Sequence, residues 1–177
     1  PFHQAAAAIG DANLDGTREV VAGDWSCYVY SWNATGNWNP YGNSFLWEQI
    51  TGDADTSIVN SSVALGDVNS FADTSRIPDA VVGSHYAAWE LFAFPGDEWG
   101  SLPANDPNHL PSQWLPKNTD AYIESSPALG LIDADSENDV AVGDDSGKLY
   151  VWLSSTRTWV SRQLAQPEDL DKAVKSS

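Results

Sequence analysis

Short runs of apolar residues alternate with polar turns along the chain, which is the pattern of short antiparallel strands. In the first third of the chain, this pattern predicts strands over residues 4–9, 19–22, 27–32 and 45–50. A polar turn over residues 33–36, which ends in glycine, predicts a hairpin between the last two strands. Four short antiparallel strands in sequence are typical of one blade of a β-propeller. The expected fold class is therefore all-β.

The same pattern occurs three times. Each time, a strand of small and apolar residues ends in glycine, an acidic loop follows, and a second strand begins with an acidic residue. The first strand is AAIG at 7–10, VALG at 63–66 and PALG at 127–130, and the second is EVVAG at 19–23, DAVVG at 79–83 and DVAVG at 139–143. An aromatic residue, a polar turn and a tryptophan then follow at Trp32 to Trp38, Phe94 to Trp99 and Trp152 to Trp159. The glycines that end the first strands stand 56 and 64 residues apart, which is the length of one unit in a repeat protein.

These landmarks divide the chain into three propeller repeats, 1–52, 53–116 and 117–166, followed by a polar tail over 167–177. A closed propeller has roughly four to eight blades, so three repeats would leave unpaired strand edges and exposed blade faces. We expect further blades to complete the structure, either from a longer chain or from other copies of this one. The sequence contains no Met, which indicates a processed protein or a piece of a longer one.

The first acidic loop carries an oxygen-bearing side chain at every second position. These residues are Asp11, Asn13, Asp15, Thr17 and Glu19, with Thr17 offering its backbone carbonyl. Alternation within a tight loop can direct these oxygen atoms toward one centre, which is the environment that Ca²⁺ prefers. The loop begins like an EF-hand, but Ala22 stands where an EF-hand has its final bidentate glutamate, and strands rather than helices flank the loop. An EF-hand is therefore excluded.

The formal net charge is −17, from 25 acidic and 8 basic residues. This charge argues against a nucleic-acid partner, because phosphates would be repelled. Bound cations would neutralise much of it, and an acidic surface such as that of a salt-adapted protein is the alternative explanation. The 42% hydrophobic content and the nine Trp indicate a packed protein, and no apolar run is long enough for insertion into a membrane.

Three stretches of the chain, residues 9–16, 125–130 and 144–152, resemble the FG-GAP/VCBS repeat family. This is the repeat of integrin α-subunit propellers and of many secreted propeller proteins. The resemblance covers nearly the whole chain. It implies a β-propeller in which Ca²⁺ is held in the loop that joins the first two strands of a blade.

The resemblance also implies ligand sets for the other two acidic loops. The third loop would supply Asp133, Asp135, Glu137 (by its carbonyl) and Asp139, whereas Leu131 stands where the first aspartate belongs. The second loop would supply Asp67, Asn69, Asp73 and Asp79, around an insertion. We rank the three sites first, third, second. The alternative for each loop is a set of hydrogen-bonded turns built by Asp and Asn side chains without metal.

No catalytic motif is present in the sequence. The residues His3, His85 and His109 are scattered, Cys27 is alone, and the repeated positions of most Trp residues favour packing between blades over ligand binding. We therefore expect a non-catalytic, calcium-stabilised extracellular module that binds protein or carbohydrate in adhesion or surface assembly. Two alternatives stay open: the propeller portion of a secreted carbohydrate-active enzyme, and a structural subunit of an extracellular filament or sheath.

Overall fold

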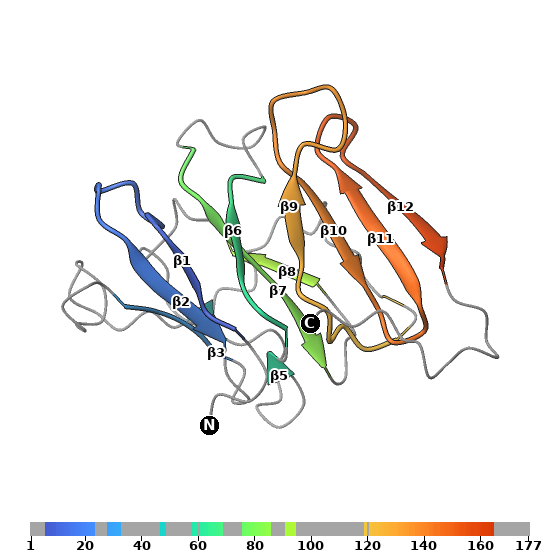
Figure 1. Ribbon diagram of the computed structural model, residues 1–177, viewed down its shortest axis with the longest axis horizontal. Coiled ribbons are helices and arrows are strands. Elements are labelled where there is room, and N and C mark those ends of the chain that lie inside the picture. The colour runs from blue at the N-terminus through green and yellow to red at the C-terminus, as the bar shows by residue number, and fades with distance from the viewer. Residues whose placement is uncertain are drawn as a thin grey trace.

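The computed structural model describes residues 6–23, 28–32, 47–48, 58–59, 61–68, 76–85, 91–94, 119 and 121–164. In this part of the chain every regular element is a β-strand, which confirms the all-β prediction. The strands form three antiparallel sheets that stand side by side in chain order (Figure 1). These sheets do not close into a ring.

In the first and third sheets, the spatial order of the strands follows their order in the chain. The first sheet contains β1 (Ala8–Gly10), β2 (Glu19–Gly23), β3 (Tyr28–Trp32) and β4 (Trp47–Glu48). The third contains β9 (Ala128–Gly130), β10 (Asp139–Gly143), β11 (Lys148–Leu153) and β12 (Thr158–Gln163). In the second sheet, β7 (Asp79–His85) pairs with β5 (Ile58–Val59), β6 (Ala64–Gly66) and β8 (Leu91–Phe94).

The strands predicted from the sequence are present, with shifted ends. The strand expected over 4–9 begins only at Ala8 and includes Gly10, and the one expected over 45–50 is described only at Trp47 and Glu48. The turn expected over 33–36 and the tail over 167–177 lie outside the described residues. The division of the chain into repeats stays a prediction.

The three sheets share one register in their first hairpin. The glycine that ends the first strand stands opposite the acidic residue that begins the second: Gly10 opposite Glu19, Gly66 opposite Asp79, and Gly130 opposite Asp139. Because side chains alternate along a strand, this shared register gives every sheet two corresponding faces. We call them face A and face B.

Face A and face B are defined by rows of paired residues. Face A carries Ala8, Val21 and Ser31 in the first sheet, Ala64, Val81 and Ala93 in the second, and Ala128, Ala141, Val151 and Val160 in the third. Face B carries Ile9, Val20 and Trp32 in the first sheet, Leu65 and Ala80 in the second, and Leu129, Val140, Trp152 and Trp159 in the third.

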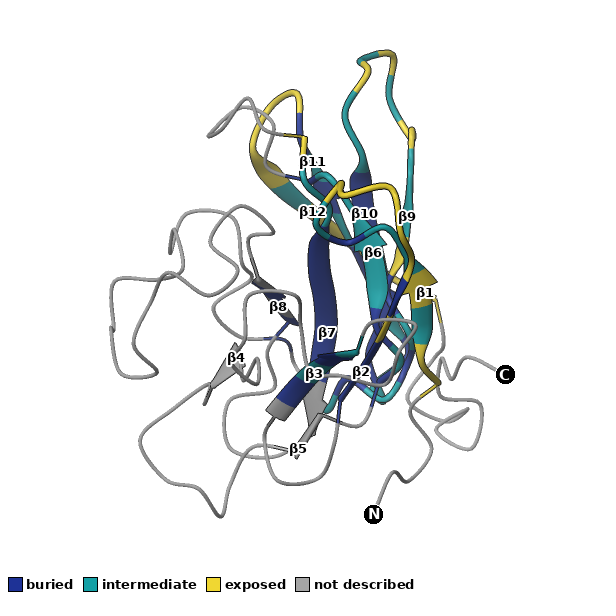
Figure 2. Cartoon of the chain, turned by 90° about the vertical axis from the view of Figure 1, so that its left-hand side faces the viewer, coloured by how far each residue is buried: buried dark blue, intermediate teal, exposed yellow. Residues whose placement is uncertain are grey.

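The core lies between the sheets, where face A of one sheet packs on face B of the next. One cluster joins Ala12, Val21 and Val29 of the first sheet and its loop to Val63, Ala80 and Val82 of the second. The other cluster joins Val68, Val81, Leu91 and Ala93 of the second sheet and its loop to Ile123, Val140, Val142, Tyr150 and Trp152 of the third. β7 of the middle sheet is thus covered on both sides, which explains why its residues 80–82 read as a continuous apolar run. In Figure 2, β7 is dark blue where its burial is described.

The turn between β10 and β11 is held by a buried aspartate, Asp144. Asp144 is fully buried, and its Oδ1 accepts hydrogen bonds from the backbone N–H groups of Ser146 and Lys148, each at 3.0 Å. Its Oδ2 accepts a hydrogen bond from the Tyr150 hydroxyl at 3.1 Å. Gly147 has a φ of 78°, a left-handed conformation that glycine adopts without strain. One buried aspartate therefore holds the whole turn.

Candidate metal centre

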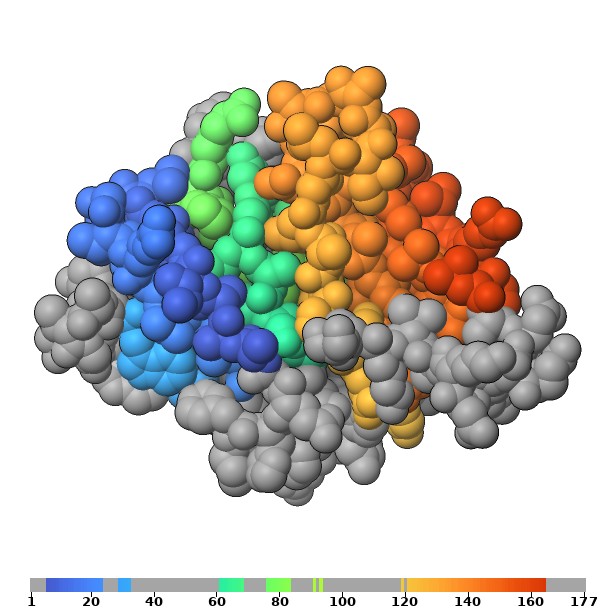
Figure 3. Space-filling model, in the orientation of Figure 1, coloured from blue at the N-terminus to red at the C-terminus, as the bar shows by residue number. Residues whose placement is uncertain are grey.

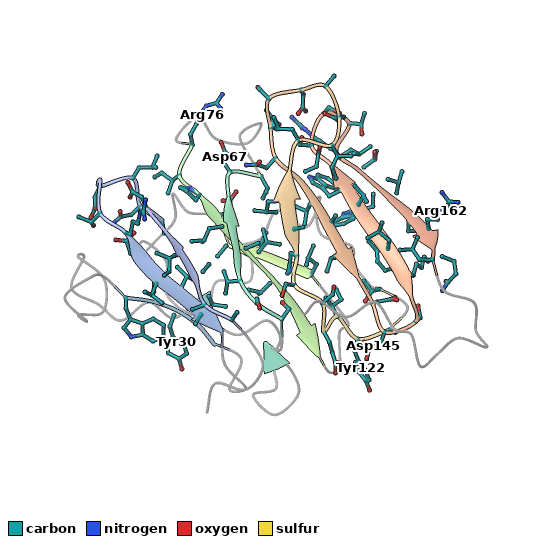
Figure 4. The ribbon with its side chains drawn as sticks, in the orientation of Figure 1. Tyr30, Asp67, Arg76, Tyr122, Asp145 and Arg162 are labelled. Atoms are coloured by element: carbon teal, nitrogen blue, oxygen red, sulfur yellow. The ribbon has the colours of Figure 1, made fainter. Side chains whose placement is uncertain are left out.

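The acidic loops of the three sheets leave from the same edge of the molecule. Each lies between the two strands of its hairpin. In Figure 1 the β1–β2 and β9–β10 connections are at the top, as are the described ends of the β6–β7 connection. In Figure 4, Asp67 and Arg76 mark this edge in the second sheet, whereas Tyr122 and Asp145 mark the opposite end of the third.

Asp11 organises the first loop. Its Oδ1 accepts a hydrogen bond from the N–H of Asp15 and its Oδ2 from the N–H of Gly16, both at 3.0 Å. Leu14 and Gly16 have φ values of 56° and 88°, so the backbone turns sharply between the two ends of the loop. A carboxylate at the start of the loop thus fixes the backbone four and five residues ahead.

Asn13 and Asp15 continue this inward pattern. The Oδ1 atom of Asn13 accepts a hydrogen bond from the N–H of Asp15 at 3.1 Å, and Oδ1 of Asp15 accepts one from the N–H of Thr17 at 2.8 Å. The Thr17 hydroxyl also donates to Asp15 Oδ1, and this bond is the main cause that lowers the pKa of Asp15. The structure thus gives the side chain and N–H of Thr17 a role, in addition to the carbonyl considered from the sequence.

Glu19 closes the loop from its buried end. Its side chain is 1% exposed, and its Oε2 accepts a hydrogen bond from the N–H of Ala12 at 2.9 Å. Burial raises the pKa of Glu19, and the negative charges of Asp15 and Asp11 raise it further, against the lowering effect of its hydrogen bonds. Three carboxylates from one loop are therefore close enough to repel one another.

The bond between Glu19 and Ala12 has a counterpart in each of the other two loops. Oδ2 of Asp79 accepts from the N–H of Val68 at 2.9 Å, and Oδ2 of Asp139 accepts from the N–H of Ile132 at 2.7 Å. Asp79 and Asp139 are both fully buried. The acidic residue that begins each second strand is therefore the internal anchor of its loop.

The second loop is described only at its two ends. Asp67 and Asp79 flank it, while Asn69 and Asp73 lie outside the described residues. The backbone oxygen of Asp67 accepts a hydrogen bond from the Asn138 side chain at 3.1 Å, which ties the second loop to the third. The ligand set predicted for this loop stays a prediction.

The third loop is held by residues that sequence reasoning missed. Asp139 Oδ1 accepts from the N–H of Ser154 at 2.9 Å, the Ser154 hydroxyl donates to Asp135 Oδ2 at 3.1 Å, and the Ser155 hydroxyl donates to Asp133. The bond to Ser155 is the main cause that lowers the pKa of Asp133. These serines follow β11, about twenty residues beyond the loop, and no local pattern connects them to it.

Glu137 and Leu131 are the two remaining positions of the third loop that were considered as ligand positions. The Glu137 N–H donates to Asp135 Oδ1 at 2.9 Å, so the loop repeats the inward pattern of the first. Leu131 is 62% exposed and offers no side-chain oxygen. Hydroxyl groups of the neighbouring turn therefore bind the carboxylates of the third loop. Among the residues that the structure describes, the hydrogen bonds to the carboxylates of the first loop come from that loop.

The candidate ligands of the first loop suit Ca²⁺ in the chemistry of their donor atoms, but they are not arranged around an ion in the structure. The candidate ligands of the first loop can each offer an oxygen atom, which is the donor that a hard cation requires. In the structure, however, their carboxylates accept hydrogen bonds from backbone N–H groups. Among the residues that the structure describes, no group of three or more His, Cys, Asp and Glu side chains is arranged to hold a metal ion. The donor set fits Ca²⁺, and its carboxylates would have to turn from the backbone N–H groups toward the ion.

The structure describes only some of the tryptophan, histidine and cysteine residues that were considered from the sequence. Trp152 is 1% exposed and packs against Trp159 with ring centroids 5.4 Å apart, as expected for tryptophans that serve packing. His3, His109 and Cys27 lie outside the described residues. Over the described ranges, no helix has the length and apolar character needed to span a membrane.

Comparison with protein-family models finds no family that matches the chain, and comparison with curated proteins finds no relative.

Proposed function

We propose that the chain is a calcium-stabilised extracellular module of β-propeller type, which binds protein or carbohydrate and has no catalytic role of its own. Three features support this proposal: stacked antiparallel sheets, acidic loops on one edge, and the resemblance of these loops to calcium-binding propeller repeats. The proposal includes closure of the sheets into a ring, which is the feature that defines a propeller.

One observation supports calcium more than any other. Glu19 is almost fully buried, and Asp11 and Asp15 raise its pKa through their negative charge. Burying a carboxylate beside like charges costs free energy unless a cation neutralises them. A Ca²⁺ ion bound to these three side chains would remove that cost and would stabilise the hairpin of β1 and β2.

Thermal unfolding with calcium and with a chelator tests the metal site. We expect calcium to raise the Tm of the parent protein, because a ligand at a hundred times its Kd adds about 2.7 kcal/mol to the stability of the folded state. The substitutions Asp11→Asn and Asp15→Asn together keep an acceptor oxygen for the loop backbone and remove two charges. This double variant should lose most of the shift.

The third loop provides the matched control. Asp133→Asn with Asp135→Asn removes the same two charges from a loop that serine hydroxyls already hold, so most of the calcium shift should remain. Equal shifts in the parent and in the Asp11, Asp15 double variant would contradict the site, as would the absence of any shift in the parent.

The ligand of the module is proposed from the resemblance alone. Binding of the calcium-loaded chain to immobilised glycans and to extracellular matrix proteins would test it. Turnover of a polysaccharide by the purified chain would instead favour the carbohydrate-active enzyme.

A further inference from the structure

Among the residues that the structure describes, the two outer faces of the stack have no neighbouring sheet. Face A of the first and second sheets is covered by the sheet that follows, and face B of the second and third is covered by the sheet that precedes. Face B of the first sheet and face A of the third are the two left over. Figure 3 shows the order directly: β1 in blue, β6 in green and β9 in orange lie side by side.

Face B of the first sheet is apolar and open around Ile9 and Val20. Ile9 is 68% exposed and Val20 is 37% exposed. The residues at the position of Val20 in the other two sheets, Ala80 and Val140, are 0% and 2% exposed. Figure 2 shows yellow in β1, where Ile9 is exposed, whereas its counterpart β6 in the second sheet is of intermediate burial.

Face A of the third sheet is open in the same way. Val160, in the row of Ala128 and Ala141, is 50% exposed. Ile132, at the start of the third loop, is 55% exposed. Its counterparts Ala12 and Val68 are fully buried in the two contacts between sheets.

A glycine and a branched side chain mark both internal contacts. A Cβ atom built on Gly10 would lie 3.1 Å from Leu65 Cδ1, and one built on Gly66 would lie 2.8 Å from Leu129 Cδ1. Each sheet therefore places its leucine on the glycine of the sheet before it. At the two ends, the equivalent residues are unmatched in the described part of the chain: no atom of it lies within 4 Å of a Cβ built on Gly130, and Ile9 is exposed.

We propose that a second copy of this chain covers these faces, with face B of its first sheet on face A of the third sheet. Ile9 of one copy would pack on Gly130 of the other, as Leu65 packs on Gly10 and Leu129 on Gly66. A second copy is the occupant that the structure favours, because it carries both halves of a contact that already occurs twice within the chain. The inference rests on the packing of the sheets and does not require bound calcium.

The contact is heterologous, since two different surfaces meet. Such a contact builds a closed ring if the rotation closes and a filament if it does not. Two copies arranged in this way would form a ring of six sheets joined by two identical contacts. A longer polymer would use the same pair of faces.

The test is the oligomeric state in solution, measured by light scattering after size-exclusion chromatography and by sedimentation over a range of concentrations. The parent chain should associate with increasing concentration. Ile9→Glu and Gly130→Glu each place a charge in the contact and should weaken association by about tenfold or more. Ser161→Glu adds the same charge to an exposed site of β12 outside both end faces and should associate like the parent.

Mixing the two variants identifies the contact as head-to-tail. The Ile9→Glu chain keeps an intact Gly130 face, and the Gly130→Glu chain keeps an intact Ile9 face. A mixture should therefore associate where neither variant does alone, which also shows that both variants are folded. A parent that stays monomeric at all concentrations, association that neither substitution weakens, or a mixture that fails to associate would each overturn the proposal.

Discussion

Leu129 packs on Gly66 so closely that a Cβ atom at Gly66 would lie 2.8 Å from Leu129 Cδ1. The contact joins β6 of the second sheet to β9 of the third, beside the point where the Asn138 side chain donates to the Asp67 backbone. The short alanine–leucine–glycine motif that recurs along the sequence thus serves the stacking of one sheet on the next.

Gly66→Ala is expected to destabilise the protein by about 1 to 3 kcal/mol, because the added methyl group overpacks the contact with Leu129. Urea unfolding measures the loss. In a Leu129→Ala background, where the clashing methyl groups are gone, the added cost of Gly66→Ala should largely disappear. If Gly66→Ala destabilises the parent and the Leu129→Ala variant equally, the contact with Leu129 is not the reason for glycine at this position, and the backbone conformation of Gly66 is.

Ser31→Ala is expected to stabilise the protein by about 1 kcal/mol. The Ser31 hydroxyl is buried on face A of the first sheet and has no hydrogen-bond partner in the part of the chain that the structure describes. Burial of such a group costs free energy, and the same position in the second sheet is Ala93. Comparison of the urea midpoints of parent and variant tests this, and a lower midpoint for Ser31→Ala would contradict it.

The raised pKa of Glu19 predicts that the stability of the calcium-free protein depends on pH. Its pKa is raised, chiefly by burial, so the folded chain binds this proton more tightly than the unfolded chain does. The contribution of Glu19 to the free energy of unfolding should therefore grow as the pH falls from neutrality toward 4.5, the ordinary pKa of a glutamic acid side chain. The measurement is the stability difference between the parent and Glu19→Gln across this range in the presence of chelator.

The difference in stability between the parent and Glu19→Gln reports on Glu19, because the other carboxyl groups are present and titrate in both proteins. The parent should gain stability relative to Glu19→Gln as the pH falls, and the opposite slope would contradict the raised pKa. Saturating calcium should reduce the effect, since a bound cation favours the ionised carboxylate.

Leu131→Asp is expected to strengthen calcium binding at the third loop. The substitution restores a carboxylate at the position of Asp11, at a site that is 62% exposed and tolerates a polar residue. The variant should show a larger calcium-dependent rise in Tm than the parent, and Leu131→Asn, of similar size without the charge, should not. If both variants respond like the parent, the missing aspartate is not what distinguishes the third loop from the first.

The strands and the acidic loops could be predicted from the sequence because their causes are local. The β-branched run at Val20 and Val21 favours a strand, and a glycine at Gly147 allows the left-handed turn between β10 and β11. Alternation of Asp11, Asn13 and Asp15 brings side-chain oxygens onto one side of a tight loop. Each of these effects extends over only a few residues, so the order of residues is sufficient to reveal it.

The tertiary structure decided everything that depends on residues far apart in the chain. Only the stacking of sheets brings Leu129 against Gly66, and only the approach of the β11–β12 turn brings Ser154 and Ser155 to the carboxylates of the third loop. The exposure of Ile9 could not be predicted either, since Leu65 and Leu129 have the same local pattern and differ only in having a neighbouring sheet. The sequence by itself determined where the strands and acidic loops lie, whereas burial against a neighbouring sheet decided which apolar residues form a core and which remain open.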